Sequence, residues 1–257
     1  MKDVLSAENR GVLEKFARSN VLLAFDYDGT LAPIVPDRGR AAMRETTRLL
    51  LEELARLYPC IVVSGRAHHD AMARVRGAGV HEVVGNHGLE PWHATAKLEA
   101  EVGGWRRFLE ERLAGLHGVE IEDKVYSLAI HYRRAPQKER ARAAIMEAAS
   151  ALDRVRIIGG KQVVNLLPEG APHKGIAVER ERARLECDTA IYVGDDETDE
   201  DVFALDDPGR LLTIRVGRGR SLAAYFIGGQ TRIDELLEAL LALRQHSRIA
   251  LPPWRGR

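Results

Sequence analysis

The feature that most constrains the fold is an apolar segment that ends abruptly in two aspartates. Residues 22–25 read Leu-Leu-Ala-Phe, and Asp26 and Asp28 follow at once, on either side of Tyr27. A short run that is apolar throughout is typical of a strand buried on both faces of a parallel sheet. Ligands bind such sheets beyond the carboxyl ends of the strands, where these aspartates stand. We therefore expect an α/β fold with a polar site at this strand end.

The two aspartates also indicate the chemistry of that site. Alternation along the strand end directs Asp26 and Asp28 the same way. Two like charges so close together repel each other unless a cation lies between them. Gly29 then allows the chain to turn sharply. The segment predicts a carboxylate site that binds a cation, and the alternative is an acidic turn without function.

Ser64 follows a second short apolar strand, Cys60–Val63, as Asp26 follows the first. Its hydroxyl stands beside Gly65, which allows backbone N–H groups to come close to a ligand. Such a pair is suited to binding a phosphate oxygen. Taken alone, Ser64 is better explained as a turn serine, but beside the first motif a phosphate-binding role is favoured.

Lys174 stands at the predicted start of a helix, in the sequence His173-Lys174-Gly175. The helix dipole disfavours a cation at this end, so the residue is not explained by helix stability. We expect it to pair with Asp26 and with a phosphoryl group. A solvated surface lysine is the alternative.

A third apolar strand, residues 190–193, ends in Gly194 and an acidic run from Asp195 to Asp201. Carboxylate oxygens are the ligands that Mg²⁺ prefers. An EF-hand loop is excluded because Glu200 occupies the sixth position, where that loop needs glycine. Acidic residues also favour a helix N-terminus, so not every carboxylate here needs a catalytic role.

These strand-end motifs, in this order, resemble those of the haloacid dehalogenase (HAD) phosphatases. The resemblance implies a HAD-like Rossmannoid core with a parallel sheet. It also implies that Asp26 is the phosphorylated nucleophile, that Asp28 acts as acid and base, and that Ser64 and Lys174 hold the phosphoryl oxygens. The cofactor implied is Mg²⁺, and its expected site comprises Asp26, Asp28 through its backbone carbonyl, Asp195, and Asp196 or Asp199 in support.

Between the second and third motifs the pattern changes to helix, hairpin, helix, hairpin. The second hairpin is predicted from residues 155–158 and 162–167, which flank Gly159-Gly160. We therefore expect residues 97–167 to form a smaller, inserted α+β domain, which corresponds to the C2-type cap of the resembled superfamily. Residues 1–96 and 168–257 would form the phosphatase core.

A narrower resemblance is to the trehalose-6-phosphate phosphatases. It rests on Ser-Gly-Arg at 64–66, Gly-Asn-His-Gly-x-Glu at 85–90, Lys124 with His-Tyr-Arg at 131–133, and the acidic segment 195–203. The resemblance implies hydrolysis of trehalose 6-phosphate to trehalose and phosphate. The candidate substrate-binding residues are Arg66, Asn86, His87, Lys124, His131, Arg133 and Asn165.

The segment before Lys174 departs from the pattern of that family. The family commonly has glutamate and arginine where this chain has Asn165 and Leu167. An amide can still bond a sugar hydroxyl, so we expect a changed sugar contact with unchanged catalysis. A phosphatase for another sugar or glycoside phosphate therefore remains an alternative. A phosphomutase of the same superfamily is a weaker alternative; its product would retain phosphate, so release of free phosphate decides between the two. A non-catalytic regulatory domain is also a weaker alternative, because both aspartates of the first motif are present.

The composition excludes other classes of function. Lys+Arg and Asp+Glu both total 38, so bulk charge gives no sign of a nucleic-acid or membrane-surface protein. No apolar run reaches the roughly 18 residues that a membrane-spanning helix needs, and the first residues contain no secretory signal. Cys60 and Cys187 lack metal-ligand spacing and are expected to be reduced thiols. We expect a cytoplasmic monomer acting on a small sugar phosphate.

Overall fold

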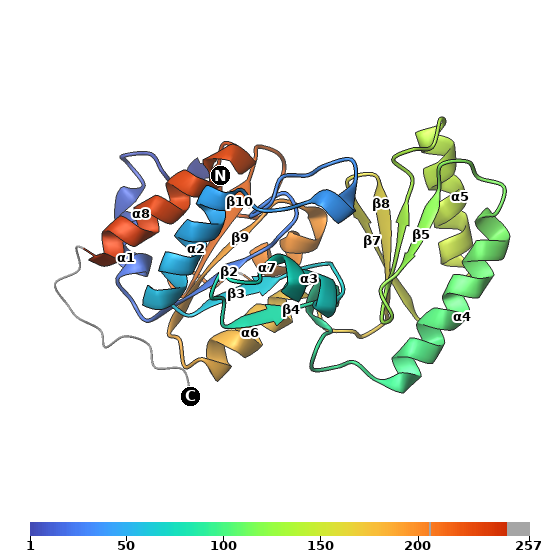
Figure 1. Ribbon diagram of the computed structural model, residues 1–257, viewed down its shortest axis with the longest axis horizontal. Helices are drawn as coiled ribbons and strands as arrows, with labels where there is room; N and C mark the ends of the chain where they lie inside the picture. The colour runs from blue at the N-terminus through green and yellow to red at the C-terminus, as the bar shows by residue number, and fades with distance from the viewer. Residues whose placement is uncertain (206, 246–257) are drawn as a thin grey trace.

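The computed structural model describes residues 1–205 and 207–245, and Figure 1 shows two β-sheets that lie side by side. The sequence of residues 248–257, with Pro252-Pro253 and several basic residues, predicts a loose tail, and these residues lie outside the described part. Among the residues described, no helix is both long enough and apolar enough to cross a membrane.

The larger sheet is parallel throughout, as the α/β expectation requires. Its described strands, in spatial order, are β1 (Lys2–Asp3), β11 (Tyr225–Ile227), β10 (Leu211–Val216), β9 (Thr189–Gly194), β2 (Val21–Phe25), β3 (Cys60–Val63) and β4 (Glu82–Val84). From β2 the chain proceeds outward through β3 and β4, and later outward on the other side through β9 and β10. The order therefore reverses between β2 and β9, and such a reversal is where open α/β sheets bind ligands.

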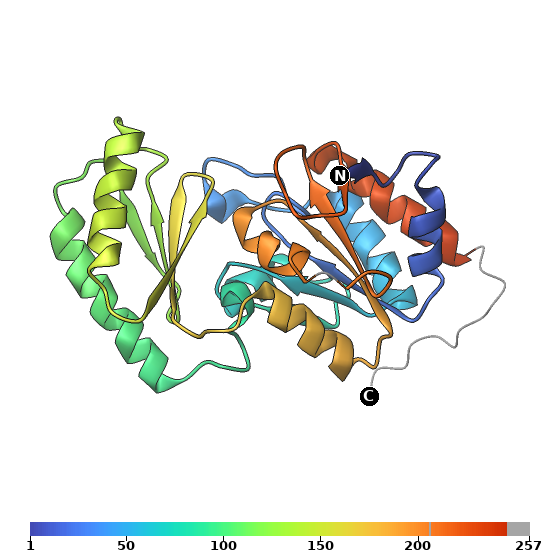
Figure 2. The same cartoon turned by 180° about the vertical axis from the view of Figure 1, so that it is seen from behind.

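Alternation along the central strand builds two apolar layers. Leu23 and Phe25 pack with helices on one face, whereas Leu22 and Ala24 pack with helices on the other. The face of Leu23 and Phe25 is covered mainly by α1 (Arg10–Ala17), α2 (Glu45–Leu57) and α8 (Ile233–Gln245), and α3 (His68–Arg74) lies beside β4. The opposite face is covered by α6 (Lys174–Arg184) and α7 (Glu200–Phe203). Figure 2 shows α6 and α7 from that second side. Burial on both faces explains why the sequence of β2 is apolar without interruption.

The smaller sheet is antiparallel and comes from the chain between β4 and α6. Its strands, in spatial order, are β5 (Glu120–Asp123), β6 (Leu128–His131), β8 (Val163–Pro168) and β7 (Val155–Gly160), and its helices are α4 (Ala96–Leu113) and α5 (Lys138–Ser150). Both helices lie on the side of this sheet away from the core (Figures 1 and 2). We call these elements the cap, and the larger sheet with its helices the core. The fold is thus the expected HAD-like core with a smaller α+β module.

Alternation in β6 decides which side chains face the core. Leu128, Ile130 and Tyr132 pack with the cap helices. Ala129 and His131 face the opposite way and line a cavity. The alternation of residues from Ser127 to Arg133, which puts Leu128, Ile130 and Tyr132 on one face, predicts this division.

The second cap hairpin differs from its predicted form. Gly159 and Gly160 do not form the turn but continue β7, and the chain turns at Lys161 and Gln162. A Cβ added at Gly159 would lie 2.4 Å from a carboxylate oxygen of Glu197 in the core. The glycine is therefore required by the close approach of a core loop and not by a turn.

Polar contacts join cap to core around the cavity. Arg156 on β7 donates to both carboxylate oxygens of Asp201, at 2.7 and 2.8 Å. Lys124 Nζ donates to the carbonyl of Gly65 at 2.7 Å, and Arg133 Nη1 donates to that of Val35 at 3.1 Å. These contacts therefore hold the cap against the core.

Candidate active site

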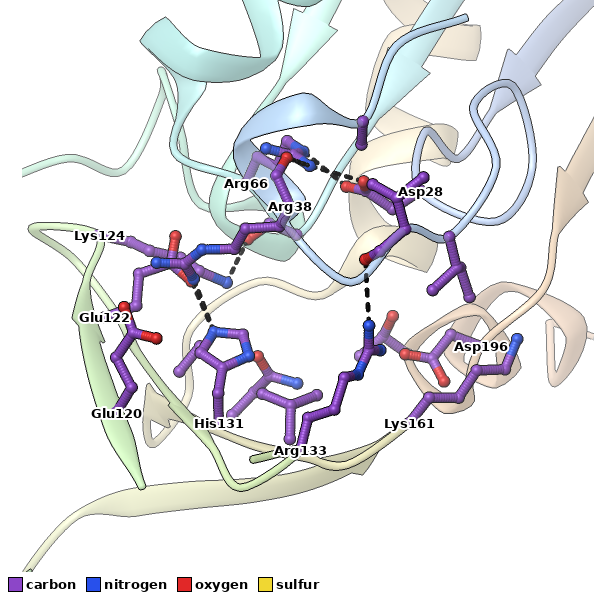
Figure 3. Close-up of a pocket in the computed structure, with 18 of the residues that line it drawn as sticks. Asp28, Arg38, Arg66, Glu120, Glu122, Lys124, His131, Arg133, Lys161 and Asp196 are labelled. Atoms are coloured by element: carbon purple, nitrogen blue, oxygen red, sulfur yellow. Dashed lines mark hydrogen bonds and ion pairs between the residues drawn. The ribbon is translucent and has the colours of Figure 1, made fainter. Parts of the chain in front are cut away.

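A cavity of about 500 Å³ lies between the carboxyl end of the core sheet and the inner face of the cap sheet (Figure 3). Asp26, Asp28 and Lys174 line it from the core, and His131 and Asn165 line it from the cap. The volume is within the range of small-molecule sites. The cavity is the candidate active site.

Asp26 and Lys174 meet at the core end of this cavity, as the sequence predicted. Lys174 Nζ lies 2.7 Å from Asp26 Oδ1 and 2.8 Å from Asp199 Oδ1, and all three side chains are buried. Burial by itself lowers the pKa of the Lys174 ammonium, but the two carboxylates outweigh that effect and raise it above its usual value. Lys174 is therefore a fixed positive charge beside the candidate nucleophile.

Asp26, Asp195 and Asp199 form a buried acidic cluster, and one ligand atom from each lies within 4.8 Å of the others. Burial, with the neighbouring carboxylates, raises the pKa of Asp26 well above its ordinary value and that of Asp195 to about 6. Besides Lys174, the cation that reaches this cluster among the described residues is Lys161, which pairs with Asp195 and is half exposed. The cluster thus has a surplus of negative charge.

The three carboxylates are not equivalent in their bonding. Asp199 Oδ1 accepts from Lys174 and from Tyr192 Oη, and Oδ2 accepts from the backbone N–H groups of Asp195 and Asp196. Both of its oxygens are thus engaged. By contrast, Asp195 Oδ1 is buried without a hydrogen-bond partner in the described chain. An unpaired buried carboxylate oxygen is costly, and a bound cation would compensate it.

Gly29 allows the chain after β2 to approach this cluster. Its φ is +90°, and an added Cβ would lie 2.2 Å from Asp195 Oδ2. Both the backbone conformation and the space therefore require glycine. Asp196, which the sequence also offered as a support for the metal, lines the cavity and is half buried.

Asp28 points toward Arg66 (Figure 3). Arg66 Nε and Nη2 donate to Asp28 Oδ2 and Oδ1 at 2.6 and 2.7 Å, and Nη1 donates to Asp70 Oδ2 at 2.6 Å. Two parallel bonds between a guanidinium and a carboxylate fix the orientation of both groups. Both residues line the cavity. Arg66 therefore fixes the orientation of the Asp28 carboxylate at the cavity wall.

Ser64 and His87 come from neighbouring strand ends. Ser64 is buried, and its Oγ accepts from the backbone N–H of Arg66 at 3.1 Å. His87 is buried and lines the cavity; an added Cβ on Gly65 would lie 2.4 Å from its ring. Burial, and then the neighbouring cations, hold the pKa of His87 well below its usual value, so the ring is neutral.

Asn86 lies behind the cavity and not in its wall. Its amide nitrogen donates to Glu90 Oε2 and to the carbonyl of Lys124, and its oxygen accepts from Ser127 Oγ. The amide is therefore occupied in joining the core to the cap strand.

The remaining predicted cap residues, Lys124, His131, Arg133 and Asn165, all line the cavity. Burial is the main cause that lowers the pKa of Lys124 to about 7 and that of His131 to about 4; nearby cations add to it. His131 is consequently neutral at neutral pH. The pairing of Ala129 with Asn165 across β6 and β8 places Asn165 on the same face as His131.

Sequence reasoning missed six charged residues that line the cavity, namely Asp37, Arg38, Glu120, Glu122, Arg134 and Lys161. Glu120 lies opposite His131 in the β5–β6 ladder, and Glu122 lies opposite Ala129. The alternation of acidic residues along β5 was a signal that could have placed them on the cavity face. No comparable pattern marks Arg38, which lies in a loop.

The fold and the site together define the class of protein. A parallel core with a carboxylate pair, a hydroxyl, a buried lysine and an acidic cluster at its strand ends, beneath an inserted cap, is a HAD-like phosphatase hydrolase. The model of the trehalose-phosphatase family matches residues 24–210. The chain belongs to the trehalose-phosphatase family.

Individual relatives agree with this assignment. A trehalose-phosphate phosphatase of Mycobacterium ulcerans is 32% identical over 220 residues, covering 79% of this chain and 56% of the relative. The probable trehalose-phosphate phosphatase D of Arabidopsis thaliana is 26% identical over 263 residues, covering 92% and 71%. The trehalose-6-phosphate phosphatase C-terminal domain of C. albicans has the same fold, with a TM-score of 0.78 at 22% identity over 91% of this chain and 98% of that one.

Proposed function

We propose that this protein hydrolyses trehalose 6-phosphate to trehalose and phosphate, with Asp26 as a covalent nucleophile. The observation that carries the proposal is the position of Asp26. Its carboxylate is buried at the end of the central strand, 2.7 Å from Lys174, at the floor of a cavity whose opposite wall is polar. A phosphate bound there would meet a nucleophile and a fixed cation together.

In the first step, an oxygen of Asp26 attacks phosphorus and the bond from phosphorus to the sugar oxygen breaks. Asp28 gives its proton to the departing oxygen, so the sugar leaves as an alcohol. Asp28 accepts two bonds from Arg66, so we infer that one of them yields when substrate enters. Lys174 and Ser64 hold the phosphoryl oxygens.

In the second step, water attacks the phosphorus of the aspartyl-phosphate and Asp28 takes a proton from that water. The bond from phosphorus to the Asp26 oxygen breaks, which releases inorganic phosphate and restores both carboxyl groups. Two displacements through a covalent intermediate replace one difficult hydrolysis.

The acidic cluster suits a Mg²⁺ ion. Asp26, Asp195 and the backbone carbonyl of Asp28 would hold it, whereas Asp199 and Asp196 would keep Asp195 in place. The unpartnered Asp195 Oδ1 and the surplus of negative charge support this assignment. When bound, the ion would neutralise charge between the phosphate and the nucleophile.

We further propose that residues 97–167 act as a cap domain that covers the sugar and that residues 1–96 and 168–257 act as the catalytic domain. Lys124, His131, Arg133 and Asn165 would contact the sugar, together with Arg66 and His87 on the core side. Closure of a lid over the site excludes bulk water. We also propose that the enzyme acts in the cytoplasm, a reducing compartment in which the free thiols of Cys60 and Cys187 are expected, and that it acts as a monomer.

Removal of Mg²⁺ is expected to abolish activity. Protein dialysed against a chelator should release no phosphate, and added Mg²⁺ should restore the rate more fully than Ca²⁺ does. Ca²⁺ takes more ligands at longer distances, which would misplace the nucleophile relative to phosphorus. Full activity in excess chelator would show that the acidic cluster is not a metal site.

The function itself is tested by phosphate release from a panel of substrates. Trehalose 6-phosphate, glucose 6-phosphate, another disaccharide phosphate and p-nitrophenyl phosphate are compared with Mg²⁺ at equal concentrations. We expect the highest kcat/KM for trehalose 6-phosphate, because interactions remote from phosphorus can be used in the transition state. A clear preference for another sugar phosphate would refute the substrate and leave the phosphatase chemistry in place.

A further inference from the structure

A loop of the core reaches across the cavity to the cap through Arg38. This residue begins the short 3₁₀-helix Arg38–Arg40, in the chain that follows β2. Its Nη1 lies 2.6 Å from His131 Nε2 and forms an ion pair with Glu122. The neutral His131 ring can accept a hydrogen bond from this guanidinium. Core and cap thus share one charged cluster, which consists of Arg38, Glu122 and His131.

The backbone of this loop is held firmly from the core side. The carbonyl of Arg38 accepts from Arg66 Nη2 at 2.9 Å, and Arg74 donates to the carbonyls of Gly39 and Ala41. Asp37 Oδ1 accepts from the backbone N–H of Gly39. The backbone position of Arg38 is therefore set before a ligand arrives, which reduces the entropic cost of binding.

The guanidinium has donors left for a ligand. Within the described chain, the side-chain hydrogen bond of Arg38 and its ion pair with Glu122 both involve Nη1, which leaves Nε and Nη2 as donors. Figure 3 shows Arg38, Glu122 and His131 on the opposite side of the cavity from Lys161 and Asp196. The cluster therefore stands at the end of the cavity away from the acidic cluster, where the part of the leaving group farthest from phosphorus would lie.

We propose that Arg38 is a specificity-determining residue, which binds hydroxyl groups of the leaving sugar beside Glu122. A sugar hydroxyl both donates and accepts, so adjoining guanidinium donors and carboxylate acceptors match it. A small aryl alcohol offers no hydroxyl to this cluster. The inference rests on the proposed function and extends recognition of the sugar from the cap to the core.

The test compares Arg38→Met and Arg38→Lys with Arg40→Met, a matched control. Arg40 lies in the same short helix, but its side chain is 86% exposed and does not line the cavity. The substrates are the sugar phosphate that the wild type prefers in the panel above, and p-nitrophenyl phosphate. The bond from Arg66 uses the backbone carbonyl of residue 38, so these substitutions leave the support of Asp28 unchanged.

For Arg38→Met we expect kcat/KM for the sugar phosphate to fall about 10- to 100-fold, mainly through KM, as for loss of a hydrogen bond from a charged group. The value for p-nitrophenyl phosphate should stay within about threefold of wild type, and inhibition of that reaction by the free sugar should weaken about as much as sugar-phosphate binding. Arg38→Lys should lie in between, since an ammonium lacks the planar fork. Arg40→Met should match wild type on both substrates.

Equal losses on both substrates would overturn the proposal, because they would show that Arg38 only supports the fold. An unchanged kcat/KM for the sugar phosphate would also overturn it, as would a wild type that prefers no sugar phosphate to the aryl phosphate. Failure of the proposed function is visible separately, in the substrate preference of the wild type alone. Thermal unfolding of each variant identifies one that does not fold, and Arg38→Lys, which keeps the charge, then decides.

Discussion

Replacement of Asp26 by asparagine is expected to lower kcat at least about a thousandfold, which corresponds to about 4 kcal/mol in the barrier. The amide cannot attack phosphorus, although its size and shape allow it to occupy the same space beside Lys174. Phosphate release in the presence of Mg²⁺ measures the loss, and circular dichroism checks that the fold is kept. A residual rate above about one tenth of wild type would contradict covalent catalysis by this residue.

Asp28→Asn serves as the control for this variant because it removes the acid and base and leaves the nucleophile intact. The first step should be slow, and the second should be slower still, since water is no longer activated. A brief reaction stopped with acid should therefore trap phosphate on Asp28→Asn and none on Asp26→Asn. Equal trapping on both variants would place the covalent bond on another residue.

Substitution of Lys174 by methionine is expected to affect both stability and catalysis strongly. The lysine is the buried counter-ion of Asp26 and Asp199, and its removal leaves two buried carboxylates without the ammonium that neutralises them. Breaking a buried ion pair from one side costs about 3–5 kcal/mol. Urea unfolding in chelator should show a decrease of that size in the free energy of unfolding, and phosphate release should fall by about a thousandfold or more.

Lys161→Met provides the matched comparison for stability. Lys161 also pairs with an aspartate of the cluster, but its side chain is 52% exposed. The Asp195 side chain is buried, at 3% exposed, but the Lys161 ammonium stays hydrated. Loss of this pair should therefore cost less stability than loss of Lys174 in the same urea experiment. If both methionine variants lost the same stability, the buried position of Lys174 would not be the reason for its effect.

The core of the site could be predicted from sequence because each of its parts ends a strand. Asp26, Ser64 and Asp195 each follow an apolar run, and parallel strands bring their carboxyl ends to one edge of a sheet. Lys174 was visible as a cation at an unfavourable helix position. The inward face of β6 followed from strict alternation, and the HAD-like class followed from the order of the motifs.

Other parts depend on how the cap sits on the core, which local patterns do not encode. Arg38 meets Glu122 only because a loop after β2 and a cap strand approach each other in space. The glycines of β7 were interpreted as a turn because their actual reason, the approach of Glu197, lies elsewhere in the chain. Strands β1 and β11 have two and three residues, too few for a period to be recognised.

The polar contacts that join cap and core have a consequence for the rate of turnover. Movement of the cap away from the core would widen the exit for a disaccharide, and that movement breaks the contacts of Arg156 with Asp201 and of Arg133 with the Val35 carbonyl. Tighter closure therefore lengthens the residence time of the product while it protects the intermediate. Release of trehalose, and not bond cleavage, would then be the rate-limiting step, as in many enzymes with lids. Salt, which weakens exposed ion pairs, would hasten that release.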